Sequence, residues 1–290
     1  IQSVCTYALI LTLLLSQTGV EIAADVEREQ RLVAELEANL FDGDLQRLSA
    51  GKVTFTAVEL RPDSTPVRGS IILLHGRGVH ADWPDNIGPL RMALAQNGWH
   101  TLSLQMPVLE KSAKYFDYLA ILPEAFPRIE AGIKHLLTGG HRPIVLLAHS
   151  CGAHMAMAWL EATAGRHIDA FIGIGMGATD YRQPMQRPFP FATLKIPVLD
   201  IYGSEDYPAV HRLAPIRLEK IQLGGHRGST QVVVDGARRT KKAKESKEPR
   251  IKLPTWAKRP APATPAVRLV AKDDGGLGCT CPPDSMSSNK

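Results

Sequence analysis

The segment from Ile144 to Ala162 constrains the fold of this chain more than any other stretch. Its first residues, Ile144 to Leu147, are apolar and predict a strand buried on both faces, and an apolar helix is expected over Cys151 to Ala162. The sharp turn between them is Ala148-His149-Ser150-Cys151-Gly152, a G-x-S-x-G pattern with alanine in its first position. Small residues on both sides let strand and helix approach closely, which exposes the Ser150 hydroxyl. The pattern predicts a nucleophilic serine, and the alternative is a serine that only caps the helix.

Strands alternate with helices of crossover length along most of the chain. The expected strands are 53–60, 70–74, 99–104, 144–147, 168–174, 196–202 and 231–234, and the expected helices are 25–41, 87–97, 123–137, 151–162 and 208–223. This order predicts an α/β fold with a doubly wound, mostly parallel sheet, which binds ligands at the C-terminal ends of its strands. Strand 53–60 is expected on the outside of the sheet. Helix 25–41 is expected to lie across the domain or to attach loosely.

Several motifs resemble known proteins. The turn Leu74-His75-Gly76-Arg77-Gly78, the elbow at Ser150 and the segment from Leu199 to Asp206 are similar to those of the α/β-hydrolase superfamily. More narrowly, the runs 75–84, 105–109 and 200–208 resemble a family of exported Gram-negative bacterial α/β-hydrolase-like proteins, which is classed as a domain of unknown function. The likeness covers about Asp25 to Ala237 and does not continue from Arg238 onward.

The resemblance implies roles for the residues around the elbow. Ser150 is the expected nucleophile, and the backbone N–H groups of Arg77 and Cys151 are the expected oxyanion donors. Glycines beside Arg77 let the backbone approach a substrate carbonyl. The alternative for this segment is a plain tight turn.

The catalytic acid of this fold usually follows the seventh strand, within Gly203-Ser204-Glu205-Asp206. Asp206 is the expected acid and Glu205 its substitute. Asp200 lies inside the strand and is a weaker candidate. The acid would orient a histidine and stabilise its imidazolium form.

The expected histidine is missing from its usual place. In the resembled family the last strand runs into an Asp-His pair, whereas here Ala237 is followed by Arg238, and no histidine occurs after His226. His226 precedes the last strand, so it is expected at the opposite end of the sheet from Ser150, and it remains only a weak candidate base. His211 would need its helix to tilt inward.

No metal and no cofactor are predicted. His75, His80, His149 and His154 have neither an i,i+4 spacing nor an H-E-x-x-H pattern. Aromatic residues in the long loops 106–122 and 175–194 are equally compatible with an apolar acyl or aryl pocket and with packing anchors. The expected partner is a small-molecule acyl substrate.

The first 24 residues resemble a secretory signal peptide. The apolar run Tyr7 to Leu15 is too short to span a bilayer, and Ile22-Ala23-Ala24 offers a cleavage site of small residues. The sequence therefore predicts a leader over 1–24, a domain over 25–237, no stable membrane span after cleavage, and a periplasmic or secreted protein. The alternative is a buried helix or a membrane anchor.

Residues 238–290 differ in composition from the rest of the chain. They hold 13 Lys and Arg against 5 Asp and Glu, a charge of +8, so the overall charge of +5 leaves −3 for the residues before them. Because Trp256 is the only aromatic residue there, a disordered, basic, Pro-rich tail is favoured over a nucleic-acid site. No segment supplies the usual C-terminal helix of the fold.

Two hypotheses explain this tail. The coding frame changes near Ala237, or a genuine basic tail binds anionic partners, with Cys279 and Cys281 as possible metal ligands. For the whole chain, the sequence predicts a serine hydrolase of the carboxylic-ester type whose activity is in doubt without its histidine. The alternative is an inactive exported binding protein that retains the pocket.

Overall fold

The computed structural model of the 290-residue chain describes residues 23–63, 65–237, 270–271 and 277–278. The predicted leader lies outside the described residues apart from Ala23 and Ala24. The predicted tail also lies outside them, apart from the two-residue strands β9 (Val270–Ala271) and β10 (Leu277–Gly278), which pair antiparallel with each other.

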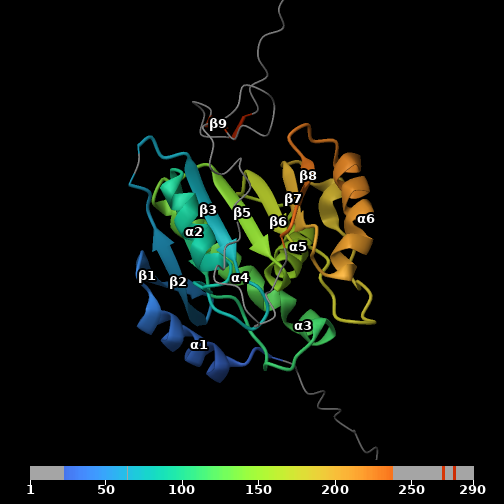
Figure 1. Ribbon diagram of the computed structural model, residues 1–290. Coiled ribbons are helices and arrows are strands. Elements are labelled where there is room, and N and C mark those ends of the chain that lie inside the picture. Colours follow the sequence, from blue (N-terminus) through green and yellow to red (C-terminus); the bar gives the residue numbers. More distant parts are fainter. Residues whose placement is uncertain (1–22, 64, 238–269, 272–276, 279–290) are drawn as a thin grey trace, which may run out of the picture.

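An eight-stranded sheet with the order β1-β2-β4-β3-β5-β6-β7-β8 forms the centre of the fold (Figure 1). The strands from β4 to β8 are parallel to their neighbours, while β1 and β2 are antiparallel. The strands are β1 (Asp44–Ala50), β2 (Val53–Leu60), β3 (Gly69–Leu74), β4 (Trp99–Leu104), β5 (Ile144–His149), β6 (Ala170–Ile174), β7 (Val198–Gly203) and β8 (Thr230–Val234). The predicted doubly wound, mostly parallel α/β sheet is confirmed.

The edge of the sheet differs from the prediction. Strand 53–60 is β2, and it lies inside the sheet because β1 pairs with it on its outer side. The two strands form a hairpin closed by Gly51 and Lys52, in which Gly51 adopts a φ of 65° that glycine tolerates. No strand is predicted over Asp44–Ala50, because its mixed polar and apolar residues alternate only weakly.

Helices connect the strands and cover the two faces of the sheet. They are α1 (Val26–Asn39), α2 (Ile87–Gln96), α3 (Tyr115–Ile121), α4 (Phe126–Thr138), α5 (Cys151–Thr163) and α6 (Pro208–Gly224), with short 3₁₀ helices η1 (Leu122–Ala125) and η2 (Pro190–Thr193). Helix α3 and η1 lie where a long loop and the start of a helix were expected. None of the described helices has the length and apolar character needed to cross a membrane.

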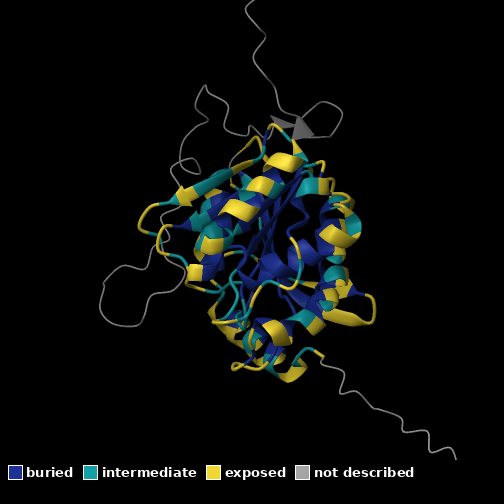
Figure 2. Ribbon diagram, turned by 90° about the vertical axis from the view of Figure 1, so that its right-hand side faces the viewer, coloured by how far each residue is buried: buried dark blue, intermediate teal, exposed yellow. Residues whose placement is uncertain are grey.

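The two faces of the sheet are covered differently. On one face, side chains of α4, α5 and α6 form the larger apolar cluster with the strands. On the other face, α2 is the only described helix that contributes to the apolar cluster, which includes Val145, Ile172 and Ile201. In Figure 2 the buried residues occupy the central strands, and the exposed ones lie on the outer sides of the helices. After β8 the structure describes only 235–237 and the short strands β9 and β10, so the predicted absence of a C-terminal helix lies outside the described residues.

Helix α1 is firmly attached to the domain. Asp25 caps its N-terminus by accepting from the Arg28 N–H at 2.9 Å, and Leu36 is buried with only 1% exposure. The Glu29 carboxylate receives two hydrogen bonds, of 2.7 and 3.0 Å, from the Arg128 guanidinium of α4. Of the two predicted arrangements for this helix, lying across the domain is the one observed.

Asp200 of β7 and Arg217 of α6 form a fully buried ion pair that fixes this helix to the sheet. Arg217 Nε donates to Asp200 Oδ2 at 2.6 Å, and Gln231 of β8 donates to the same oxygen at 2.7 Å. Burial raises the pKa of Asp200 against the opposing effects of Arg217 and Gln231. The pair therefore links β7, β8 and α6. The predicted acid, Asp206, lies in the loop between β7 and α6.

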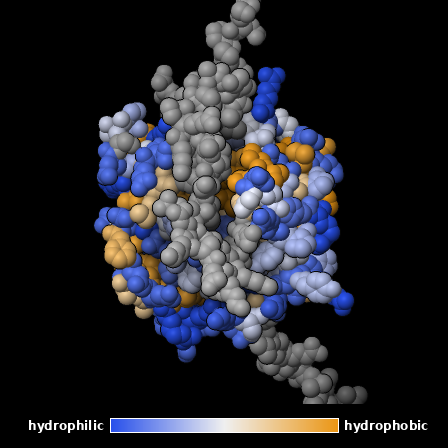
Figure 3. Space-filling view, viewed as in Figure 1, coloured by the Kyte–Doolittle hydropathy of each residue, from blue (hydrophilic) through white to orange (hydrophobic). Residues whose placement is uncertain are grey.

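The surface in the view of Figure 3 is largely hydrophilic at its periphery, with separate apolar areas between the charged ones. Large apolar side chains that are exposed come from different elements, for example Phe41 at 96% and Leu223 at 62%. Scattered exposed apolar residues are normal for a folded domain.

Candidate functional site

Ser150 lies at the sharp turn between β5 and α5, as the sequence predicts. Its backbone has φ 58° and ψ −114°, a region that residues with a side chain rarely adopt. The Ser150 N–H donates to the Ile174 carbonyl of β6 at 2.9 Å, which holds the turn against the neighbouring strand. The strained geometry expected for this serine is thus present.

Two glycines make room for the turn. A Cβ on Gly152 would clash with the carbonyl oxygens of Leu74 and His75. A Cβ on Gly76 would approach the Ser150 Cβ to 3.5 Å. The end of β3 and the start of α5 therefore touch through backbone atoms, which explains why small residues flank Ser150.

Ser150 lines a cavity of about 610 Å³ at the C-terminal edge of the parallel strands. Arg77 and Cys151, the two predicted oxyanion residues, line the same cavity. Ser150 is 1% exposed, and its Oγ makes no hydrogen bond within the described part of the chain. The structure therefore brings these three predicted site residues together.

His75 supports the turn after β3 as a neutral imidazole. Its Nδ1 donates to the Gly76 carbonyl at 2.8 Å, and its Nε2 accepts from the Met106 N–H at 2.8 Å. Complete burial lowers the pKa of His75 to about 3, despite the hydrogen bond to Gly76. His75 thus joins the loops after β3 and β4, and both of its nitrogens already have partners.

The Arg77 side chain is held by a carboxylate that sequence reasoning did not identify. Arg77 Nη1 donates to Asp180 Oδ2 at 2.7 Å, and the Tyr115 N–H donates to the same oxygen at 2.7 Å. Burial alone would raise the pKa of Asp180, but the hydrogen bonds from Arg77 and Tyr115 bring it below its usual value. Asp180 therefore fixes the wall of the cavity. Its position in the long loop after β6 is the only sequence signal for this role.

Asp206 follows β7 and is half-buried. Its Oδ1 accepts from the Tyr207 N–H at 2.8 Å, and its Oδ2 faces Gly175, where an added Cβ would lie 3.2 Å away. Glu205, the substitute acid, is exposed. Asp200 is buried in its ion pair with Arg217 and does not reach the cavity.

The end of β8 and the residues that follow it lie beside the loop that carries Asp206. The Ser204 N–H donates to the Val234 carbonyl at 2.9 Å, and the Glu205 N–H donates to the Ala237 carbonyl at 3.0 Å. The segment after β8 is therefore bonded to the loop that carries the predicted acid. Arg238, which stands where the resembled family continues toward its Asp-His pair, follows directly from this contact in the sequence.

The structure does not bring His226 to Ser150. His226 precedes β8, where its Nδ1 accepts from the Gly228 N–H at 3.1 Å. Thr230 at the start of β8 pairs with Leu199 near the start of β7, and five residues of β8 place about 16 Å between the two ends of the strand. The prediction of His226 as the base therefore does not agree with its position at the opposite edge of the sheet.

Two other histidines lie closer to the cavity. His154 in the first turn of α5 lines it, and its Nε2 lies 3.2 Å from the Ala178 carbonyl. The His211 ring packs edge-on against Tyr202, with ring centres 5.5 Å apart. Since Ser150 Oγ has no hydrogen-bond partner among the described residues, neither histidine is engaged with it.

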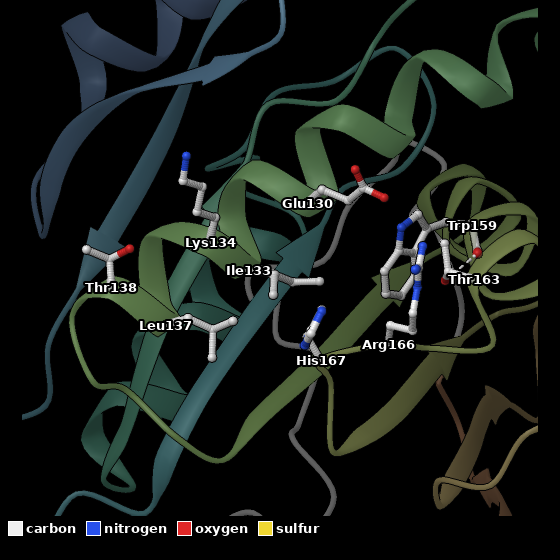
Figure 4. A pocket seen from close by; sticks show the side chains of 9 residues that line it. All are labelled: Glu130, Ile133, Lys134, Leu137, Thr138, Trp159, Thr163, Arg166 and His167. Atoms are coloured by element: carbon white, nitrogen blue, oxygen red, sulfur yellow. Dashed lines mark hydrogen bonds between the residues drawn. The ribbon is translucent and has the colours of Figure 1, made fainter.

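Most aromatic residues of the two long loops serve packing. Tyr118, Phe189 and Phe191 are buried in the larger apolar cluster, whereas Tyr115 and Tyr181 line the cavity. A second cavity, of about 420 Å³, lies between α4 and α5 and contains none of the predicted site residues (Figure 4). Of the two expected uses of these aromatics, anchoring the loops is thus the main one.

Comparison with known proteins gives a family and a fold. The sequence matches the model of a family described as "Protein of unknown function (DUF3530)" over residues 16–123 and 118–252, so the match reaches beyond Ala237. No curated protein matches the sequence.

Solved structures with a similar fold are hydrolase-like proteins. An α/β serine hydrolase homologue from Coxiella burnetii is 16% identical, with 69% of this chain and 90% of that chain covered and a TM-score of 0.50. A dienelactone hydrolase from Anabaena variabilis is 20% identical, with 68% and 88% covered and a TM-score of 0.50. A cold-adapted esterase from an Arctic intertidal metagenomic library is 14% identical, with 74% and 87% covered and a TM-score of 0.50. These similarities establish the α/β-hydrolase fold.

The strain at Ser150 predicts an unusual order of stabilities. We expect Ser150→Gly to be more stable than Ser150→Ala by about 1 kcal/mol, because both lose the hydroxyl but only glycine relieves the positive φ. Urea unfolding of the two variants measures the difference. Equal stabilities, or a less stable glycine variant, would show that the turn stores no such strain.

Burial of neutral His75 predicts a dependence of stability on pH. Its pKa is about 3 in the folded protein and about 6.5 when unfolded, so the unfolded state binds the extra proton between these values. Stability therefore falls as the pH decreases from about 6.5 toward 3, by up to about 1.4 kcal/mol per pH unit from this group. Urea unfolding between pH 4.5 and 7 should show a shallower pH slope for His75→Gln than for the wild type and for the control His226→Gln. An unchanged slope would contradict the assignment.

Proposed function

The chain belongs to the DUF3530 family, described as proteins of unknown function, and we propose that it acts as a serine hydrolase on an ester or a related acyl substrate. The observation that carries the proposal is the strained Ser150, which lines the same cavity as Arg77 and Cys151. A strained serine at a strand-to-helix turn is typical of nucleophiles in this fold.

The proposed reaction has two steps. Ser150 Oγ attacks the acyl carbonyl carbon, its proton passes to a base, and the backbone N–H groups of Arg77 and Cys151 stabilise the oxyanion. The leaving group departs with a proton, and water then attacks the acyl-enzyme and releases the acid. Asp206 would orient the base, because its loop contacts the segment that follows β8.

One specific observation favours a second function, an inactive binding protein that keeps the cavity. No histidine follows β8 in the sequence, and Ser150 Oγ has no hydrogen-bond partner among the described residues. Removing a catalytic serine or histidine from a triad lowers turnover by about 10⁶-fold, whereas substrate binding remains. Arg238 cannot act in its place, since its guanidinium stays protonated.

A fluorophosphonate probe separates the two functions. We expect the wild type to be labelled on Ser150, Ser150→Ala to remain unlabelled, and Ser112→Ala, which alters an exposed loop serine, to be labelled like the wild type. Mass spectrometry of the tryptic peptides identifies the labelled residue. An unlabelled wild type would support the binding protein, and equal labelling of Ser150→Ala would remove Ser150 as the nucleophile.

A histidine introduced after β8 strengthens this test. Arg238→His and Arg239→His place an imidazole in the segment that follows the Glu205 to Ala237 hydrogen bond. If the scaffold is a hydrolase that lacks its base, one of these variants should hydrolyse a p-nitrophenyl ester faster than the wild type, and the gain should disappear when Ser150→Ala is added.

We also propose that the protein is exported, on the strength of the apolar run Tyr7 to Leu15 and the small residues that follow it. Expression of the full sequence in a Gram-negative host, followed by N-terminal sequencing of the periplasmic fraction, tests this. We expect a mature chain that begins at Asp25. Recovery of the uncut chain in the cytoplasm or the membrane would contradict export.

A further inference from the structure

Four side chains from distant parts of the sequence meet at the edge of the sheet opposite Ser150. Glu59 belongs to β2, His100 to β4 and His135 to α4, and His141 lies between α4 and β5. Within the sheet, His100 is level with Ser70 at the beginning of β3, so the cluster lies at the N-terminal ends of the parallel strands. It is therefore separate from the cavity that Ser150 lines.

The polar atoms of the cluster converge. Ligand atoms of Glu59, His100 and His141 all lie within 4.8 Å of one another. Glu59 Oε1 is 2.7 Å from His100 Nε2, and Glu59 Oε2 is 3.2 Å from His135 Nε2. The Glu59 and His100 side chains are only 6% and 2% exposed.

Two of these atoms lack a satisfactory partner. Glu59 Oε1 and His100 Nε2 are buried, and neither makes a hydrogen bond of acceptable geometry within the described residues, although they lie close together. An unsatisfied buried polar atom is rare and unfavourable. A cation between the two atoms would satisfy both.

The surroundings hold the rings in place. Gly139 leaves room for His141, since a Cβ at that position would lie 2.8 Å from its Nε2. Ser70 Oγ lies 3.5 Å from His100 Nδ1, which leaves Nε2 directed at Glu59. A cavity of about 470 Å³ reaches Glu59, His135 and His141 from the surface, and gives an ion access. Lys134 and Thr138 of α4 line this cavity as well as the one in Figure 4.

We propose that Glu59, His100 and His141 bind a divalent transition-metal ion of the Zn²⁺ class, while His135 contacts the Glu59 carboxylate. One carboxylate and two imidazoles form a nitrogen and oxygen set that suits Zn²⁺ and not the oxygen-preferring Mg²⁺ or Ca²⁺. The ion would join β2, β4 and the α4–β5 connection, so its role is to stabilise this end of the sheet. The residues are far apart in sequence, which is why no spacing pattern marks the site.

Zinc titration of the untagged full-length protein tests the proposal. After treatment with a chelator, isothermal titration calorimetry should show one Zn²⁺ bound per chain, and Zn²⁺ should raise the thermal unfolding temperature. We expect His141→Ala and Glu59→Gln to bind at least tenfold more weakly. Gly139→Ala keeps every ligand but should also weaken binding, because its Cβ displaces the His141 ring.

Two controls make the outcome specific. His226→Ala removes a histidine at the same edge of the sheet but outside the cluster, and it should bind Zn²⁺ like the wild type. The double variant Cys279→Ser, Cys281→Ser tests the cysteines of the basic tail and should also bind normally. Absence of Zn²⁺ binding by the wild type, unchanged binding by folded His141→Ala, or binding lost only in the cysteine variant would each overturn the proposal. Circular dichroism of the metal-free variants confirms that they are folded.

Discussion

The close backbone contact between the end of β3 and the start of α5 is the constraint on which the rest of the site depends. It exists only because Gly152 has no side chain, and Ser150, the residue just before α5, has a positive φ. Ser150 lines one cavity together with Cys151 and Arg77. A single additional carbon at Gly152 would separate the two elements and dismantle this arrangement.

Much of this arrangement could be predicted from the sequence because short-range patterns determine it. The apolar run before Ser150 and the small residues around it require a strand, a turn and a helix whatever the rest of the chain does. Strand β1 was missed because its residues alternate only weakly, and its position depends on pairing with β2. Asp180 was missed for a related reason, since its pairing with Arg77 joins loops 103 residues apart. The position of His226 could be predicted because this residue precedes the last strand. In a parallel sheet it then lies at the edge opposite Ser150.

The Glu59 cluster shows the limit of sequence reasoning more clearly. Its carboxylate and imidazoles come from β2, β4, α4 and the loop after α4, and no local spacing relates them. Only the register of the sheet, which places His100 level with Ser70, brings them to one edge. His75, which the sequence singles out, is instead satisfied by backbone groups.

Helix α1 gives the N-terminal part of the chain a direct link to the loops around the cavity. The Arg28 guanidinium donates to the carbonyls of Gly78 and Leu109, and the Asp25 N–H donates to the Val108 carbonyl at 2.7 Å. Residues of α1 and its N-cap, which precede both loops in the sequence, thus hold the loops after β3 and β4 in place. If processing releases the chain at Asp25, that hydrogen bond would come from a newly formed ammonium group, and its positive charge would strengthen the bond. Maturation of the N-terminus would then tighten the loop after β4, which Arg28 of the same helix links to the loop that contributes Arg77.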